Sequence, residues 1–200
     1  MSSSAAATDL HAPERAGDYT STGLPTGRVA IWWFLASEIA IFGGAVACYL
    51  LYRLHHPEWA EQAAHTVNAA GAFNTVVLLT SSLSAVLAHH AAEQGDGKTA
   101  ARWINWTVLG GLVFLGVKAW EYAHEIGAGL VPAKSLFWSF YFLLTGLHAL
   151  HVIGGMTALY VVGRGAARGQ HLGRVELAAI YWHFVDVVWI FLFPLLYIAS

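Results

Sequence analysis

Five long apolar segments constrain this chain more than any other feature of its sequence. A helix needs roughly 20 mostly apolar residues to cross the hydrocarbon core of a bilayer. Because unpaired backbone groups are costly in lipid, each such segment is expected to be helical. The expected spans are 29–52, 70–91, 103–126, 136–162 and 177–198, separated by loops that contain glycine, proline and charged residues.

The composition excludes an ordinary water-soluble domain. Hydrophobic residues make up 57% of the 200 residues and charged residues only 11%, whereas soluble domains carry roughly 25% charged residues. The net charge of −2 gives no basic surface for nucleic acid. The single cysteine, Cys48, leaves no disulfide framework. We therefore predict an all-α integral membrane bundle of five transmembrane helices.

Basic residues indicate how the bundle is oriented. Residues 1–27 are small and polar and lack the features of a signal peptide, so we expect a disordered N-terminal tail ahead of a transmembrane domain at 28–200. Lysine and arginine concentrate on the side of the membrane that carries this tail, at Arg15, Arg28, Lys98, Arg102, Arg164, Arg168 and Arg174, against Arg53 and Lys134 on the other. The N-terminus is therefore expected in the cytoplasm and the C-terminus outside.

Several ionisable residues fall inside the expected spans, where each costs a few kcal/mol or more unless it has a partner or a purpose. They are Glu38, Lys118, Glu121, His148, His151, His183 and Asp186. Lys118 and Glu121 are three residues apart and share a helix face. They form either a self-neutralising pair or a step in a proton relay.

The histidines admit two interpretations. His148 and His151 share one helix face, and His183 and Asp186 share another, so two helices could ligate a haem or help to form a di-iron cluster. However, the histidines at 89–90 fall near the cytoplasmic end, and no Cys or Met cluster is present for copper. We expect no metal site and no catalytic residue, and interpret these side chains as an interhelical polar network.

Glu38 has no basic neighbour on its own helix, and burial favours the protonated form of a lone carboxyl group. It is either a hydrogen-bond donor to a neighbouring helix or a proton-active site. The sequence leaves both readings open.

Several motifs together resemble subunit III of the haem–copper terminal oxidases. They are FLASEIAIFGG at 34–44, LLTSSLSAVLAHH at 78–90, KAWEY at 118–122, TGLHALHVIGG at 145–155 and YWHFVDVVWIFLFPLLYI at 181–198. The resemblance covers roughly residues 28–200. The long form of this subunit has seven helices, so five spans are similar to the short form found in some bacteria. Lys118 stands where the long form has Gln.

The resemblance implies a non-catalytic chain in the bacterial plasma membrane that binds no cofactor itself. Haem and copper are then expected in the partner catalytic subunit, and the partners are subunit I, subunit II and phospholipid. The chain would support assembly, proton uptake and stability of the catalytic subunit. Glu38 would be the buried, carbodiimide-reactive glutamate of the family, and Arg164 a contact for a lipid head group.

Other functions compete with this interpretation. The alternative most similar to the oxidase subunit is an accessory subunit of a nitric oxide reductase, which has the same five-helix form. An alternative from a different functional class is a free-standing membrane enzyme with a bis-histidine haem or a di-iron cluster. A small transporter has little support, because the sequence shows no internal repeat.

Overall fold

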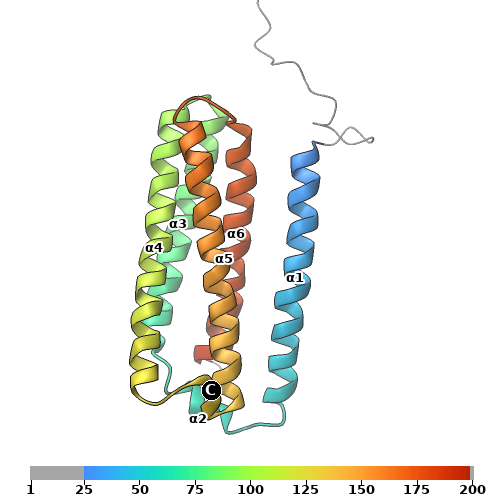
Figure 1. The fold of residues 1–200 in the computed structure, drawn as a ribbon, viewed down its shortest axis with the longest axis vertical. Helices are drawn as coiled ribbons and strands as arrows, with labels where there is room; N and C mark the ends of the chain where they lie inside the picture. The colour runs from blue at the N-terminus through green and yellow to red at the C-terminus, as the bar shows by residue number, and fades with distance from the viewer. Residues whose placement is uncertain (1–24, 199–200) are drawn as a thin grey trace, which may run out of the picture.

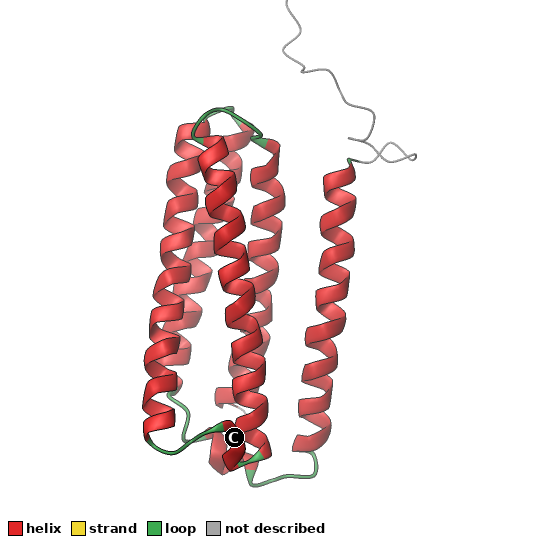
Figure 2. Cartoon of the chain, viewed as in Figure 1, coloured by secondary structure: helices red, strands yellow, loops and turns green. Residues whose placement is uncertain are grey.

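The computed structural model describes residues 25–198, and all regular structure in that part of the chain is helical (Figures 1 and 2). Five helices are long and apolar enough to cross a membrane, as predicted. The long helices are α1 (Thr26–Arg53), α3 (Asn68–Glu93), α4 (Gly97–Gly127), α5 (Leu136–Ala166) and α6 (Gly173–Phe193). Shorter elements are α2 (Trp59–Ala63), η1 (Pro132–Lys134) and the π-helical turn η2 (Pro194–Ile198). The first 24 residues of the expected tail lie outside the described residues.

The helices extend further than the apolar segments that predicted them. The third begins at Gly97 rather than at 103, and the fourth continues to Ala166 rather than ending at 162. Hydrophobicity marks only the part of a helix that lies in hydrocarbon, whereas backbone hydrogen bonding continues into the polar ends. At the start of α4, Asp96 caps the helix by accepting a hydrogen bond from the backbone N–H of Thr99.

Helices α3 to α6 pack as one group, and α1 lies beside α5 and α6 (Figure 1). Large aromatic side chains fill the interior of this group, with Trp138, Trp182 and Trp189 almost fully buried. Many apolar side chains on the outside, such as Trp33 and Leu150, are exposed. Such a surface suits lipid or neighbouring apolar chains rather than water.

Small residues set the close approach of α3 and α4. A Cβ on Gly110 would lie 2.6 Å from the Cβ of Ser81, so the two helices fit only because one position has no side chain. Ser84 and Thr107 form a hydrogen bond of 2.8 Å across the same interface. Gly116 shares the third span with Gly110, but a Cβ there would meet nothing within 4 Å.

Helix α1 is tied to the rest of the bundle by polar contacts at both ends and in the middle. At its start, Arg28 forms a 2.7 Å ion pair with Glu176 of α6. Near its end, the Tyr49 hydroxyl donates a 3.0 Å hydrogen bond to the carbonyl of Leu195 in η2. In the middle of α1, the Glu38 carboxyl group contacts His151 of α5.

Pro194 lies in the fifth span, where the sequence predicts a kink. The α-helical pattern ends at Phe193, and the chain continues as the π-helical turn η2. Proline lacks a backbone N–H and disturbs the preceding turn. The altered turn carries the buried Tyr197 hydroxyl to the Lys118 ammonium group.

The α3–α4 contact can be tested with Gly110→Ala. The added methyl group would overlap Ser81, and overpacking of this kind costs about 1–3 kcal/mol. We expect a lower unfolding midpoint in detergent, measured by circular dichroism. Gly116→Ala is the matched control and should leave the midpoint unchanged or slightly higher, since its methyl group meets open space. Equal effects of the two changes would contradict close packing at Gly110.

Asp96 gives α4 a pH-dependent cap. Hydrogen bonds from the Thr99 side chain and backbone hold the pKa of Asp96 below its ordinary value of 3.8. A pKa lowered by folding contributes stability above the unfolded value, and that contribution is lost as the pH falls through the folded value. We expect thermal stability to fall below about pH 4. Asp96→Asn retains a capping side chain and should show a smaller fall. An identical acid profile in both proteins would show that Asp96 does not contribute.

Candidate functional site

A cluster of buried charged and hydroxyl groups joins α4, α5 and η2. We call it the lysine cluster; its members are Lys118, Glu121, Glu125, Tyr141 and Tyr197, and none is more than 2% exposed. The Lys118 ammonium group lies 3.0 Å from Glu121 Oε2, 2.8 Å from the Tyr141 hydroxyl and 2.5 Å from the Tyr197 hydroxyl. The Tyr141 hydroxyl lies 2.7 Å from Glu125 Oε1 and 3.0 Å from Glu121 Oε1.

The spacing along α4 explains why the charges meet. Positions 118, 121 and 125 are separated by three and four residues and therefore face one side of the helix. Lys118 also lies over the rings of Tyr122, Tyr141 and Tyr197, at 4.9, 4.5 and 5.2 Å from their centroids. Cation–π contacts gain strength where water is excluded. The lysine is therefore enclosed by a carboxylate, two hydroxyls and aromatic faces.

A second polar contact connects α1 to α5. Glu38 Oε2 lies 2.8 Å from His151 Nε2, and Glu38 is 7% exposed. The other ring nitrogen, His151 Nδ1, lies 2.8 Å from the carbonyl oxygen of Leu147. A carbonyl can only accept a hydrogen bond, so Nδ1 carries a proton.

With a proton on His151 Nδ1, only two proton arrangements are possible in the contact between Glu38 and His151 Nε2. If the imidazole is neutral, Nε2 is an acceptor and Glu38 must be the protonated donor. If Glu38 is ionised, Nε2 must also carry a proton, and the contact is an ion pair. The pair is electrically neutral in both arrangements. One proton moving over the hydrogen bond would interconvert them.

The remaining candidates have different surroundings. His183 Nδ1 lies 2.5 Å from the Ser82 hydroxyl, which connects α6 to α3. Asp186 is 3% exposed, and the Ser82 side chain is the polar group near its carboxyl group. His148 is completely buried, its ring packs on Phe114 and Trp189 at 5.3 and 5.2 Å, and neither of its nitrogens has a partner there.

The histidines thus reach different neighbours on different helices rather than one centre. Within residues 25–198, no group of three His, Cys, Asp or Glu side chains is placed to hold one metal ion. Arg164 lies near the end of α5 and donates a 3.0 Å hydrogen bond to the exposed Tyr160 hydroxyl. Its guanidinium group also lies 5.6 Å from the centre of that ring.

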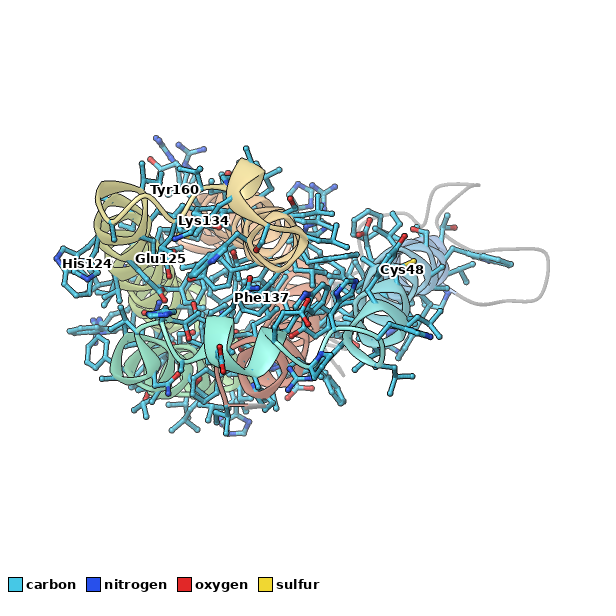
Figure 3. All side chains as sticks on the ribbon, turned by 90° about the horizontal axis from the view of Figure 1, so that it is seen from below. Cys48, His124, Glu125, Lys134, Phe137 and Tyr160 are labelled. Carbon is cyan, nitrogen blue, oxygen red and sulfur yellow. The ribbon has the colours of Figure 1, made fainter. Side chains whose placement is uncertain are left out.

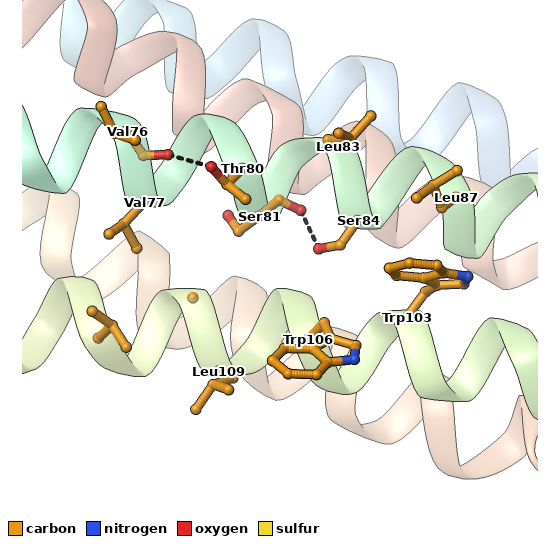
Figure 4. A pocket seen from close by; sticks show the side chains of 12 residues that line it. Val76, Val77, Thr80, Ser81, Leu83, Ser84, Leu87, Trp103, Trp106 and Leu109 are labelled. Carbon is orange, nitrogen blue, oxygen red and sulfur yellow. Dashed lines mark hydrogen bonds between the residues drawn. The ribbon is translucent and has the colours of Figure 1, made fainter.

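An apolar groove of about 460 Å³ runs between α3 and α4 (Figure 4). Its walls include Val76, Leu83, Trp103 and Trp106. The hydroxyl groups along it are already bonded within α3, as Thr80 is to the carbonyl of Val76 at 2.8 Å. The groove therefore offers shape and apolar surface but few free polar anchors.

Sequence reasoning missed several members of these clusters. Tyr141, Tyr197 and Ser82 complete the contacts of predicted residues but carry no charge that marks them within an apolar span. Glu125 lies seven residues after Lys118 on the same face of α4, and the structure adds it to the cluster as a fully buried group. Figure 3, which looks along the bundle, shows Glu125 on α4, well away from Cys48 on α1.

Comparison with known proteins places the chain in a family. Residues 14–200 match the family described as Cytochrome c oxidase subunit III. The chain is 33% identical to cytochrome c oxidase subunit 3 of Corynebacterium diphtheriae, with 98% of each chain covered. It is 39% identical to the subunit 3 of Thermostichus vulcanus, with 84% of each covered. It is also 33% identical to part of the heme–copper oxidase subunit I+III of Aeropyrum pernix, over 86% of this chain and 22% of that protein. This chain therefore belongs to the cytochrome c oxidase subunit III family.

Proposed function

We propose that this chain is the non-catalytic subunit III of a proton-pumping haem–copper oxygen reductase in the bacterial plasma membrane. The observation that carries the proposal is the family match over residues 14–200. Helices of sufficient length and hydrophobicity to span the membrane agree with it. The chain supports assembly, proton uptake and stability of the catalytic subunit and binds no cofactor. The comparisons favour this function over an accessory chain of a nitric oxide reductase.

The partners in this proposal are subunit I, which carries haem and copper, and subunit II. The relative in Aeropyrum pernix is named as a fusion of subunits I and III. A single chain that carries both subunits keeps them in one complex, which supports subunit I as a partner of this chain. Lysine and arginine are in excess on the side of the membrane that carries the N-terminal tail. This excess supports a cytoplasmic N-terminus and an outer C-terminus.

Phospholipid is a further proposed partner. Arg164 lies at the end of α5 that would face the cytoplasm, and its side chain is exposed. A guanidinium group at that depth attracts anionic head groups. The apolar side chains exposed along the outside of the bundle provide surface for the acyl chains.

We assign a structural role to Glu38 and to the interhelical polar network. Glu38 bonds α1 to α5 through His151, and His183 bonds α6 to α3 through Ser82. Lys118 and Glu121 bond α4 to α5 and η2 through tyrosine hydroxyls. His148 and Asp186 contribute by packing within the same bundle. Each hydrogen bond specifies how two helices are placed, because its loss would leave a polar group unpaired in an apolar interior.

Purification in mild detergent through a C-terminal tag tests the proposed function. We expect a larger haem- and copper-containing subunit to be recovered in stoichiometric amount, with oxygen consumption, while the isolated chain is colourless. Absorption spectra and mass spectrometry of each band provide the measurement. A haem band or bound iron retained by the isolated chain would overturn the assignment. Non-haem iron beside haem in the partner, with nitric oxide reduction, would move the chain to the other enzyme.

The structural role of Glu38 is tested by comparing two substitutions in the complex. Glu38→Gln keeps a side chain that can bond to His151, and we expect near-normal subunit retention and proton uptake. Glu38→Leu leaves His151 Nε2 without its partner, which costs about 1–3 kcal/mol. We expect it to lower the unfolding midpoint and release α1 from α5. If Gln and Leu slow proton uptake equally while the midpoint is unchanged, Glu38 acts through its proton instead.

A further inference from the structure

The lysine cluster contains more acidic groups than one lysine can neutralise. Lys118, Glu121 and Glu125 would carry a net charge of −1 if all three were ionised. Lys118 is the cation that attracts the Glu125 carboxyl group. The other ionisable groups that interact with this carboxyl group are Glu121 and Tyr122 of α4, Tyr141 of α5 and Tyr197 of η2. Tyr197 of η2 completes the cluster through Lys118 and Tyr141. An uncompensated charge in such surroundings is strongly unfavourable.

The hydrogen-bond donors of the cluster are also too few for two carboxylates. The three ammonium protons of Lys118 point to Glu121, Tyr141 and Tyr197. Tyr141 has one hydroxyl proton, and its closest acceptor is Glu125 Oε1 at 2.7 Å. The hydroxyl proton of Tyr197 faces the Tyr141 hydroxyl at 3.1 Å and the Glu121 carboxyl group, so it is not directed at Glu125. Glu125 Oε2 has no hydrogen-bond partner among the described residues and is inaccessible to solvent. Among the carboxylate oxygens of the cluster, it is the one that receives no hydrogen bond from the described residues.

We propose that the lysine cluster is a proton-binding site that holds one proton on Glu125, so that Lys118 and the Glu121 carboxylate form its only ion pair. The added proton removes the surplus negative charge and converts the unpaired oxygen into a neutral hydroxyl. Burying a neutral hydroxyl without a partner costs far less than burying an unpaired charge. Glu121 remains the anion because it contacts the ammonium group directly at 3.0 Å.

The site lies where its proton could be exchanged with one aqueous side. Glu125 is two residues from the end of α4 at Gly127, and α4 ends at the same end of the bundle as α2 (Figure 1). Tyr141 contacts both carboxyl groups, so a single hydroxyl lies between Glu125 and the Lys118–Glu121 pair. The proposal rests on these contacts and does not depend on the identity of the oxidase partner.

Infrared spectroscopy of the full chain tests the proposal. Glutamate labelled with carbon-13 at the side-chain carboxyl separates the glutamate bands from those of Asp186. The parent protein and all its variants carry Glu38→Gln, which removes the buried glutamate outside the lysine cluster. At pH 7 the parent should show one protonated glutamate band. Glu125→Gln should abolish that band, whereas the matched control at the exposed Glu93, Glu93→Gln, should retain it. The proposal would be overturned if the parent protein showed no protonated glutamate band, or if the Glu125→Gln variant kept that band.

Two more variants test the charge balance itself. In Glu121→Gln, Glu125 becomes the counterion of Lys118, so we expect the protonated band to disappear although Glu125 is still present. In Lys118→Gln, neither carboxylate has a cation, and the band should double in intensity. Circular dichroism and gel filtration identify the variants that fold. A band that persists at full intensity in folded Glu121→Gln would show that charge balance does not place the proton.

Discussion

The absence of water around the helices is the constraint on which the rest of the structure depends. In lipid, a polar side chain must find its partner inside the protein, because no solvent can replace one. The chain meets this requirement at Lys118 with a carboxylate, two tyrosine hydroxyls and aromatic rings drawn from α4, α5 and η2. The same requirement explains why Glu38 reaches across to His151. Polar residues here therefore specify which helices are neighbours.

Packing supplies the remaining specificity, since lipid is as apolar as leucine and gives helices little hydrophobic reason to associate. The α3–α4 interface depends on a glycine that faces a serine, with a hydroxyl pair nearby. Helix α1 has fewer such contacts and is held by polar ties along its length. The bundle thus combines a tightly packed four-helix group with one more loosely attached helix. An attached helix of this kind leaves much apolar surface available to lipid and to neighbouring subunits.

Family membership and the polar clusters are different kinds of information. The match over residues 14–200 identifies the family and supports a role beside a catalytic subunit. The clusters show how this particular chain places its charges. Lys118 introduces a buried cation that contacts the Glu121 carboxyl group directly and is connected to a second carboxyl group, Glu125, through the Tyr141 hydroxyl. Proton occupancy therefore becomes a property of the cluster as a whole, which no single residue determines.

The sequence by itself determined the number of long helices, their approximate positions and the family, because apolar length and motif order are properties of contiguous residues. It also placed Lys118 and Glu121 on one helix face, since that depends only on helical spacing. Only the tertiary structure decided that Glu38 meets His151, that Tyr141 and Tyr197 complete the lysine cluster, and that the His148 nitrogens have no hydrogen-bond partner among the described residues. Those contacts join residues up to 113 positions apart. They depend on the rotation and tilt of whole helices, which side-chain packing sets and local sequence does not encode.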